Sequence, residues 1–134
     1  MERDFIYKES TVARILVIDD SQSIRAKMRY FLEEGTDHEV LEATDGANAL
    51  DILKEDSRFD LIICDVNMPI MDGIAFAHSL SEDDNLRIIP FVFCTTESAA
   101  SLKKEIKGLG IEARYIMKPV TQKTLMVTLE KVLK

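Results

Sequence analysis

The sequence predicts an α/β domain of three layers, in which a parallel sheet of five strands lies between helices. Five short apolar runs of strand length alternate along the chain with five segments of helical periodicity. Crossovers between parallel strands are right-handed and each helix must cover the sheet, so this alternation favours helices on both faces. With 134 residues, 46% of them hydrophobic, the chain fits one compact domain.

The apolar runs that predict the strands are rich in Ile, Val, Leu and Phe. They read RILVID (14–19), EVLEA (39–43), FDLIICD (59–65), IPFVFCT (89–95) and ARYIMK (113–118). A parallel sheet covered on both faces needs such nearly continuous apolar strands, because neither face meets water.

Helical periodicity fills the segments between the runs. Three segments carry apolar residues every three or four positions. These residues are Ile24, Met28, Phe31 and Leu32 in the first segment, Leu102, Ile106 and Leu109 in the fourth, and Leu125, Leu129, Val132 and Leu133 in the last. Weaker patterns over Gly46 to Glu55 and Gly73 to Ser81 still allow one buried face each. Ser98 and Thr121 stand where N-caps would begin the last two helices, and Asp72-Gly73 is predicted as a turn.

Composition excludes several classes of function. The net charge of -7 and the lack of a Lys/Arg-rich stripe argue against direct binding to nucleic acid. No apolar run fits a signal peptide or the roughly 20 residues of a membrane span, so we expect a cytoplasmic protein without membrane contact. Cys64 and Cys94 each stand alone without a metal-ligand pattern and are predicted to be reduced core thiols.

Polar residues end four of the predicted strands. They are Asp19 and Asp20 after the first run, Asp65 after the third, Thr95 after the fourth and Lys118 after the fifth. Ligands of such sheets bind outside the carboxyl ends of the strands, so we expect these five residues to meet at one edge. Any one of them alone would only mark where a strand reaches water.

Three carboxylates at one place repel one another unless a cation lies between them. Their hard oxygen atoms favour Mg²⁺ or a similar ion. Lys118 would add a fixed positive charge and Thr95 a hydroxyl group. Such a group of side chains could bind a phosphoryl group during its transfer to the Asp65 carboxylate.

Four motifs in this order resemble those of the receiver domains of two-component response regulators. They are VIDDS (17–21), CDVNMPIMDG (64–73), FCTTES (93–98) and YIMKP (115–119), and the resemblance covers 14–134. It implies a flavodoxin-like fold with strand order 2-1-3-4-5. It also implies a phosphoprotein switch that has no conventional enzymatic activity apart from gaining and losing its own phosphoryl group.

The resemblance implies a role for each residue at the strand ends. Asp65 would accept the phosphoryl group from a sensor histidine kinase or a histidine phosphotransfer protein. Mg²⁺ would be bound by Asp20, Asp65 and the backbone carbonyl group of Asn67, with Asp19 acting through a metal-bound water. Lys118 would pair first with Asp65 and then with the phosphoryl oxygens.

Other residues are similar to those that transmit or end the signal in this family. Thr95 would move to bind the phosphoryl group, and Tyr115 matches the aromatic residue whose rotamer reports that movement. Asn67 and Glu97 match a pair that tunes dephosphorylation in chemotaxis-type receivers, although they could also be ordinary exposed loop residues. Pro119 makes the preceding peptide bond a candidate for the cis form.

By this resemblance, output would come from the surface of the fourth helix, fifth strand and fifth helix. Contacts with an unknown protein target are expected within Ser98 to Leu109, Ala113 to Tyr115 and Thr121 to Lys134. Residues 1–13 would be a leader before the receiver domain at 14–134. This leader would be disordered, fold back on the surface or contact a partner.

Other classes of function remain as alternatives. A phosphorelay intermediate that passes its phosphoryl group to a histidine phosphotransfer protein would use the same site. A Mg²⁺-dependent phosphohydrolase is disfavoured because Asn67 stands where a general acid is needed. An FMN-binding flavodoxin is disfavoured because DDSQS (19–23) offers carboxylates where a phosphate needs donors.

Overall fold

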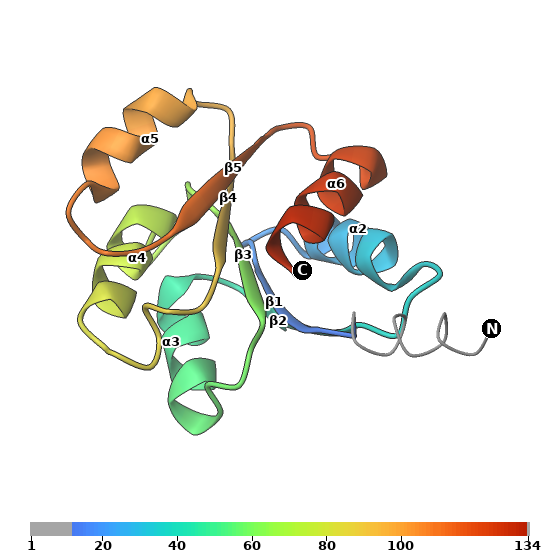
Figure 1. The fold of residues 1–134 in the computed structure, drawn as a ribbon, viewed down its shortest axis with the longest axis horizontal. Helices are drawn as coiled ribbons and strands as arrows, with labels where there is room; N and C mark the ends of the chain where they lie inside the picture. The colour runs from blue at the N-terminus through green and yellow to red at the C-terminus, as the bar shows by residue number, and fades with distance from the viewer. Residues whose placement is uncertain (1–11, 134) are drawn as a thin grey trace.

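The computed structural model describes residues 12–133 as a parallel sheet between two layers of helices (Figure 1). The strands are β1 (Arg14–Ile18), β2 (Glu39–Ala43), β3 (Leu61–Asp65), β4 (Phe91–Thr95) and β5 (Ala113–Met117). The helices are α2 (Gln22–Glu33), α3 (Gly46–Glu55), α4 (Gly73–Ser81), α5 (Ala99–Ile106) and α6 (Gln122–Val132). All pairings are parallel and the order is β2-β1-β3-β4-β5, which confirms the predicted flavodoxin-like fold.

Two apolar clusters lie on opposite faces of the sheet. On one face α3, α4 and α5 pack on β-strand residues such as Ile62 and Phe93, and on the other α2 and α6 pack on residues such as Ile63. Successive side chains of a strand point to opposite faces, so a strand covered on both sides needs apolar residues throughout. Every residue of β3 and β4 is buried for this reason.

Side-chain caps begin the helices. Each cap residue accepts a hydrogen bond from a backbone N–H of the first turn, at Ser21, Asp45, Asp72, Ser98 and Thr121. The predicted caps at Ser98 and Thr121 are confirmed.

The fourth predicted helix is shorter than its apolar pattern indicates. α5 ends at Ile106, and Leu109 lies beyond it after Gly108, whose φ of 86° is incompatible with a right-handed helix. Leu109 still packs against the core. Its burial therefore explains the apolar pattern without a further helical turn.

Ala13, just before β1, is bound by two hydrogen bonds to the segment that begins β2. The amide of Ala13 donates to His38 Nδ1 (3.0 Å), and its carbonyl oxygen accepts from the amide of Glu39 (2.8 Å). Most of the predicted leader, residues 1–11, and Lys134 of the predicted output surface lie outside the described residues. Within residues 12–133, no helix is both long and apolar enough to cross a membrane.

Candidate functional site

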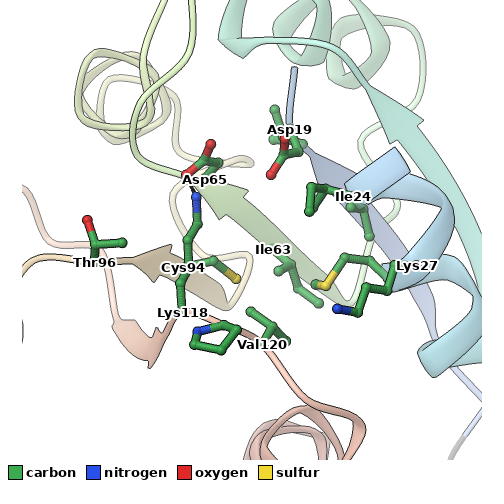
Figure 2. A pocket seen from close by; sticks show the side chains of 13 residues that line it. Asp19, Ile24, Lys27, Ile63, Asp65, Cys94, Thr96, Lys118 and Val120 are labelled. Carbon is green, nitrogen blue, oxygen red and sulfur yellow. Dashed lines mark hydrogen bonds and ion pairs between the residues drawn. The ribbon is translucent and has the colours of Figure 1, made fainter. Parts of the chain in front are cut away.

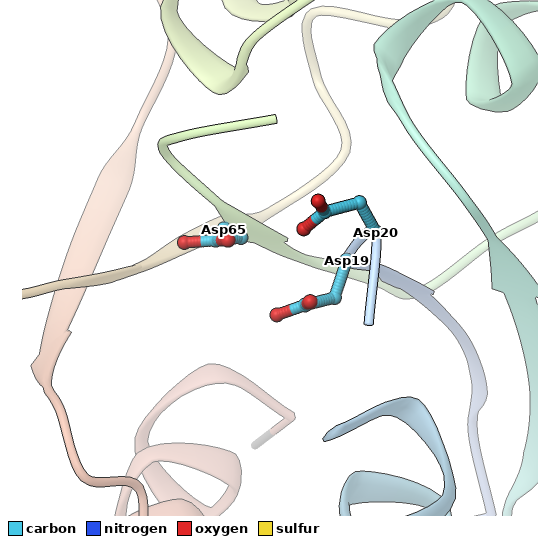
Figure 3. Close-up of side chains that lie close together, drawn as sticks. All are labelled: Asp19, Asp20 and Asp65. Atoms are coloured by element: carbon cyan, nitrogen blue, oxygen red, sulfur yellow. The ribbon is translucent and has the colours of Figure 1, made fainter. Parts of the chain in front are cut away.

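The carboxyl ends of the central strands bring three aspartates together (Figure 3). Asp19 follows β1, Asp20 comes next, and Asp65 is the last residue of β3. One carboxylate oxygen from each lies within 4.8 Å of the others. Asp19 and Asp65 are buried and Asp20 is exposed. Three mutually close carboxylates fit a hard divalent cation that keeps some of its waters.

Asp65 is held by two donors at one oxygen. The Lys118 ammonium lies 2.6 Å from Asp65 Oδ1, and the amide of Val66 donates to the same atom at 2.8 Å. The Asp65 side chain is 7% exposed and that of Lys118 34%. Partial burial disfavours the charged ammonium, but the hydrogen bond to Asp65 and the negative charges of Asp65 and Asp19 outweigh it and raise the pKa of Lys118.

The surroundings of Asp19 disfavour the charged form of its carboxylate. Burial raises its pKa, the amide of Ser21 (2.9 Å to Oδ1) lowers it, and the charge of Asp65 raises it again. The net direction is upward in the protein without a cation. A divalent ion among the three aspartates would remove this penalty.

Thr95 ends β4 with its side chain buried, and its hydroxyl is bound to the following loop. Its Oγ1 accepts a hydrogen bond from the amide of Glu97 at 2.7 Å, while its carbonyl oxygen accepts from the amide of Lys118 at 2.9 Å. The hydroxyl therefore has a backbone partner in this state. This bond uses an oxygen lone pair of the hydroxyl, whose hydrogen makes only a long contact of 3.5 Å with the carbonyl oxygen of Glu97.

Tyr115 lies on β5 beside β4, with its ring stacked on Phe93 at 5.9 Å between centroids and 16° between planes. The residue is half-buried, and burial raises the pKa of its hydroxyl. Two residues further along β5 the strand ends, and the Lys118–Pro119 peptide bond is cis. Asn67 and Glu97 are exposed in the loops after β3 and β4.

Below the aspartates lies a cavity of about 360 Å³ between α2, the sheet and the loop before α6. Figure 2 shows Asp19 and Asp65 at one end, with Ile24, Ile63 and Val120 along its walls. Cys94 also lines it, but burial raises the pKa of its thiol to about 12, so it is a poor nucleophile. Both cysteines are free and buried, as the sequence predicts.

Two residues that support the site were not identified from sequence. The sequence predicts Gly73 in a turn and at the start of a helix, without a role in the site. A Cβ atom there would lie 2.5 Å from the carbonyl oxygen of Asp65, and its amide donates to Val66 O at 2.8 Å. Arg25 donates from Nη1 to the carbonyl oxygen of Asp19 at 2.8 Å. The Asp72-Gly73 pair indicates a backbone position that favours glycine, whereas the sequence around Arg25 gives no local indication of a role in the site.

The fold and this group of side chains define a class of protein. Residues 15–130 match the model of the response regulator receiver domain, and the chain belongs to that family. The predicted resemblance is confirmed. Receiver domains are signalling modules that accept a phosphoryl group and partner histidine kinases, rather than conventional enzymes, and the acidic triad is typical of their Mg²⁺ site.

Chemotaxis proteins are among the similar relatives. Chemotaxis protein CheY-3 of Vibrio cholerae is 33% identical over 119 residues, covering 89% of this chain and 90% of that protein. Protein PilH of Pseudomonas aeruginosa is 31% identical over 122 residues, covering 91% and 98%. The structure of CheY4 of Vibrio cholerae aligns with a TM-score of 0.81 and 36% identity, covering 90% and 98%. The chain is thus a CheY-like receiver domain of two-component signalling.

Proposed function

We propose that Asp65 accepts a phosphoryl group from the phosphohistidine of a sensor histidine kinase, in a reaction that needs Mg²⁺. The observation that carries this proposal is the contact of 2.6 Å between Lys118 Nζ and Asp65 Oδ1 beside two further carboxylates. A buried carboxylate beside an ammonium group and an acidic cluster that can hold Mg²⁺ is suited to attack a phosphoryl group, because the ammonium and the cation would stabilise its charge.

Each side chain has a role in this proposal. Asp20, Asp65 and the carbonyl group of Asn67 would hold the metal, and Asp19 would act on it through water. When bound, Mg²⁺ would neutralise part of the negative charge of the phosphoryl group and the carboxylates. A carboxylate oxygen of Asp65 forms the new P–O bond while the P–N bond to the kinase histidine breaks, and that imidazole takes up a proton. Lys118 moves from Asp65 to the phosphoryl oxygens.

A movement of Thr95 would transmit the phosphorylation of Asp65 to the rest of the domain. Phosphorylation adds about one to two negative charges beside Thr95 and Lys118. Thr95 moves to donate its hydroxyl hydrogen to the phosphoryl group in place of the long contact of 3.5 Å with the carbonyl oxygen of Glu97, and the space behind it is vacated. Tyr115, three residues before Lys118, swings inward to fill that space.

The surface of α5, β5 and α6 changes shape as a result, and a partner protein that prefers this shape shifts the population toward it. We define this output surface by residues 98–109, 113–115 and 121–133, the described part of the predicted contact region.

Mass spectrometry after treatment with acetyl phosphate tests the acceptor. We expect one phosphoryl adduct on the wild type with Mg²⁺ and none on Asp65→Asn. Asp51→Asn is a matched control, because Asp51 is an exposed carboxylate of α3. An adduct on Asp65→Asn would refute the acceptor assignment, and an equal yield in excess chelator would refute the metal requirement.

A further inference from the structure

Arg25 connects the edge strand β2 to the acidic cluster. Its Nε donates to Glu42 Oε1 at 2.9 Å, and its Nη1 donates to the carbonyl oxygen of Asp19 at 2.8 Å. The amide of Asp19 in turn donates to Ala43 O at 3.1 Å, one residue after Glu42 on β2. The backbone of Asp19 is therefore fixed from β2 on both sides, directly through Ala43 and indirectly through Arg25.

The guanidinium group is held firmly enough to act as a support. The Arg25 side chain is 13% exposed, and both of its hydrogen bonds have good lengths. Hydrogen bonds from Arg29 and Arg25 lower the pKa of Glu42, so its carboxylate is charged at neutral pH. A planar fork with several donors can bond two partners in fixed directions, which a lysine ammonium on a flexible stem does less well.

The attachment of α2 to the sheet does not depend on Arg25 alone. Arg29 donates from Nε to the other oxygen of Glu42 at 2.8 Å and also pairs with Glu33. Met28 and Leu32 bury the apolar face of the helix. Of the two arginines bound to Glu42, Arg25 is the one that also donates a hydrogen bond to the carbonyl oxygen of Asp19.

We propose that Arg25, anchored by Glu42, is a positioning residue of the cation site. By holding the carbonyl group of Asp19, it sets the direction in which the Asp19 and Asp20 carboxylates point toward Asp65. These carboxylates repel one another before a cation arrives, so a fixed backbone lowers the free energy needed to assemble them. Supporting groups of this kind typically change metal affinity when they are removed. The inference rests on the proposed Mg²⁺ site.

Mg²⁺ titrations followed by amide chemical shifts test this role without any phosphorylation. We expect Arg25→Met to raise the dissociation constant for Mg²⁺ by about tenfold. Arg29→Met is the matched control, since it removes the other ion pair to Glu42 and leaves Asp19 untouched, and its dissociation constant should equal that of the wild type. Arg25→Lys, which keeps the charge and disturbs the fold less, should fall between the wild type and Arg25→Met.

Equal Mg²⁺ affinity in the wild type and both Arg25 variants would overturn the positioning role. Equal weakening in Arg25→Met and Arg29→Met would also overturn it, because the effect would then come from the attachment of α2. Absence of Mg²⁺ binding to the wild type would instead refute the proposed function.

Discussion

Lys118, which follows β5, binds Asp65 at the end of β3, so that the contact crosses the end of β4 between these two strands. Asp65 therefore has the positive ammonium group of Lys118 and two negative carboxylates as close neighbours. A divalent cation that enters this cluster meets the positive charge of Lys118 as well as the negative charges of the aspartates.

Replacement of Lys118 by methionine should strengthen Mg²⁺ binding. The variant removes a positive charge beside the metal site and leaves the three carboxylates in place. Isothermal titration with Mg²⁺ would show a lower dissociation constant than that of the wild type. Lys123→Met is the control, because Lys123 is an exposed residue of α6. Unchanged or weaker binding in Lys118→Met would show that the ammonium does not oppose the metal.

Gly73→Ala should destabilise the domain and disturb Asp65. The added methyl group would lie 2.5 Å from a backbone oxygen, so either α4 or the end of β3 must move. Overpacking of this kind costs about 1 to 3 kcal/mol in the free energy of unfolding, which urea denaturation measures. Gly35→Asn is the control, since Gly35 has φ of 71°, which asparagine tolerates, and open space around it. Equal stability of Gly73→Ala and wild type would contradict the close approach.

Asp19→Asn should stabilise the protein at neutral pH in the absence of divalent ions. Burial and the charge of Asp65 raise the pKa of Asp19, so the folded state holds that proton more tightly than the unfolded chain. Stability therefore falls as pH rises from the unfolded pKa of about 3.9 through the folded pKa, and the asparagine variant escapes this loss.

Urea denaturation in chelator, at neutral pH and at a pH of about 4, would show a gain for Asp19→Asn that shrinks at the lower pH. Asp51→Asn, at an exposed position on α3, should show no such dependence. A gain of the same size at both pH values would mean that ionisation of Asp19 does not limit stability.

Asn67 and Glu97 should set the lifetime of the phosphoryl group on Asp65. Both side chains are exposed in the loops after β3 and β4, and we propose that they affect how water approaches the phosphoryl group. We expect the wild type to lose phosphate quickly and the Asn67→Arg and Glu97→Arg variants to lose it more slowly. A change below about threefold in both, less than 1 kcal/mol of barrier, would show that neither residue controls hydrolysis.

Beryllofluoride, a phosphoryl mimic, should change the amide chemical shifts of the output surface in the presence of Mg²⁺. The largest changes are expected near Thr95 and Tyr115 and along α5 and α6, because the proposed movement of Thr95 and Tyr115 changes the surroundings of these amides. Asp65→Asn is the control that should show no response. Large changes confined to α2 and α3, with the output surface silent, would refute the route through Thr95.

Much of the site followed from local pattern. Apolar runs of strand length, with helices between them, place the ends of parallel strands at one edge of a sheet. That rule alone predicts that Asp19, Asp20, Asp65, Thr95 and Lys118 lie together. The structure brings the three aspartates and Lys118 into contact, while Thr95 joins them through its carbonyl oxygen, which accepts from the amide of Lys118. Caps such as Ser98 and Thr121 were also predictable, because a cap bonds to backbone only a few residues away.

Other features were decided only by the tertiary structure, because they depend on contacts between segments that no local pattern links. The carbonyl of Asp65 meets Gly73 only once α4 has packed beneath the sheet. Arg25 bonds to the carbonyl oxygen of Asp19 and, at the same time, to Glu42 on the neighbouring strand, two partners far apart in the sequence. The end of α5 was likewise not predictable from the apolar pattern, because Leu109 packs on the core beyond the last residue of the helix. Burial explains the apolar residue there, whereas the backbone leaves the helix at Lys107, with ψ of 134°, in a turn that the positive φ of Gly108 completes.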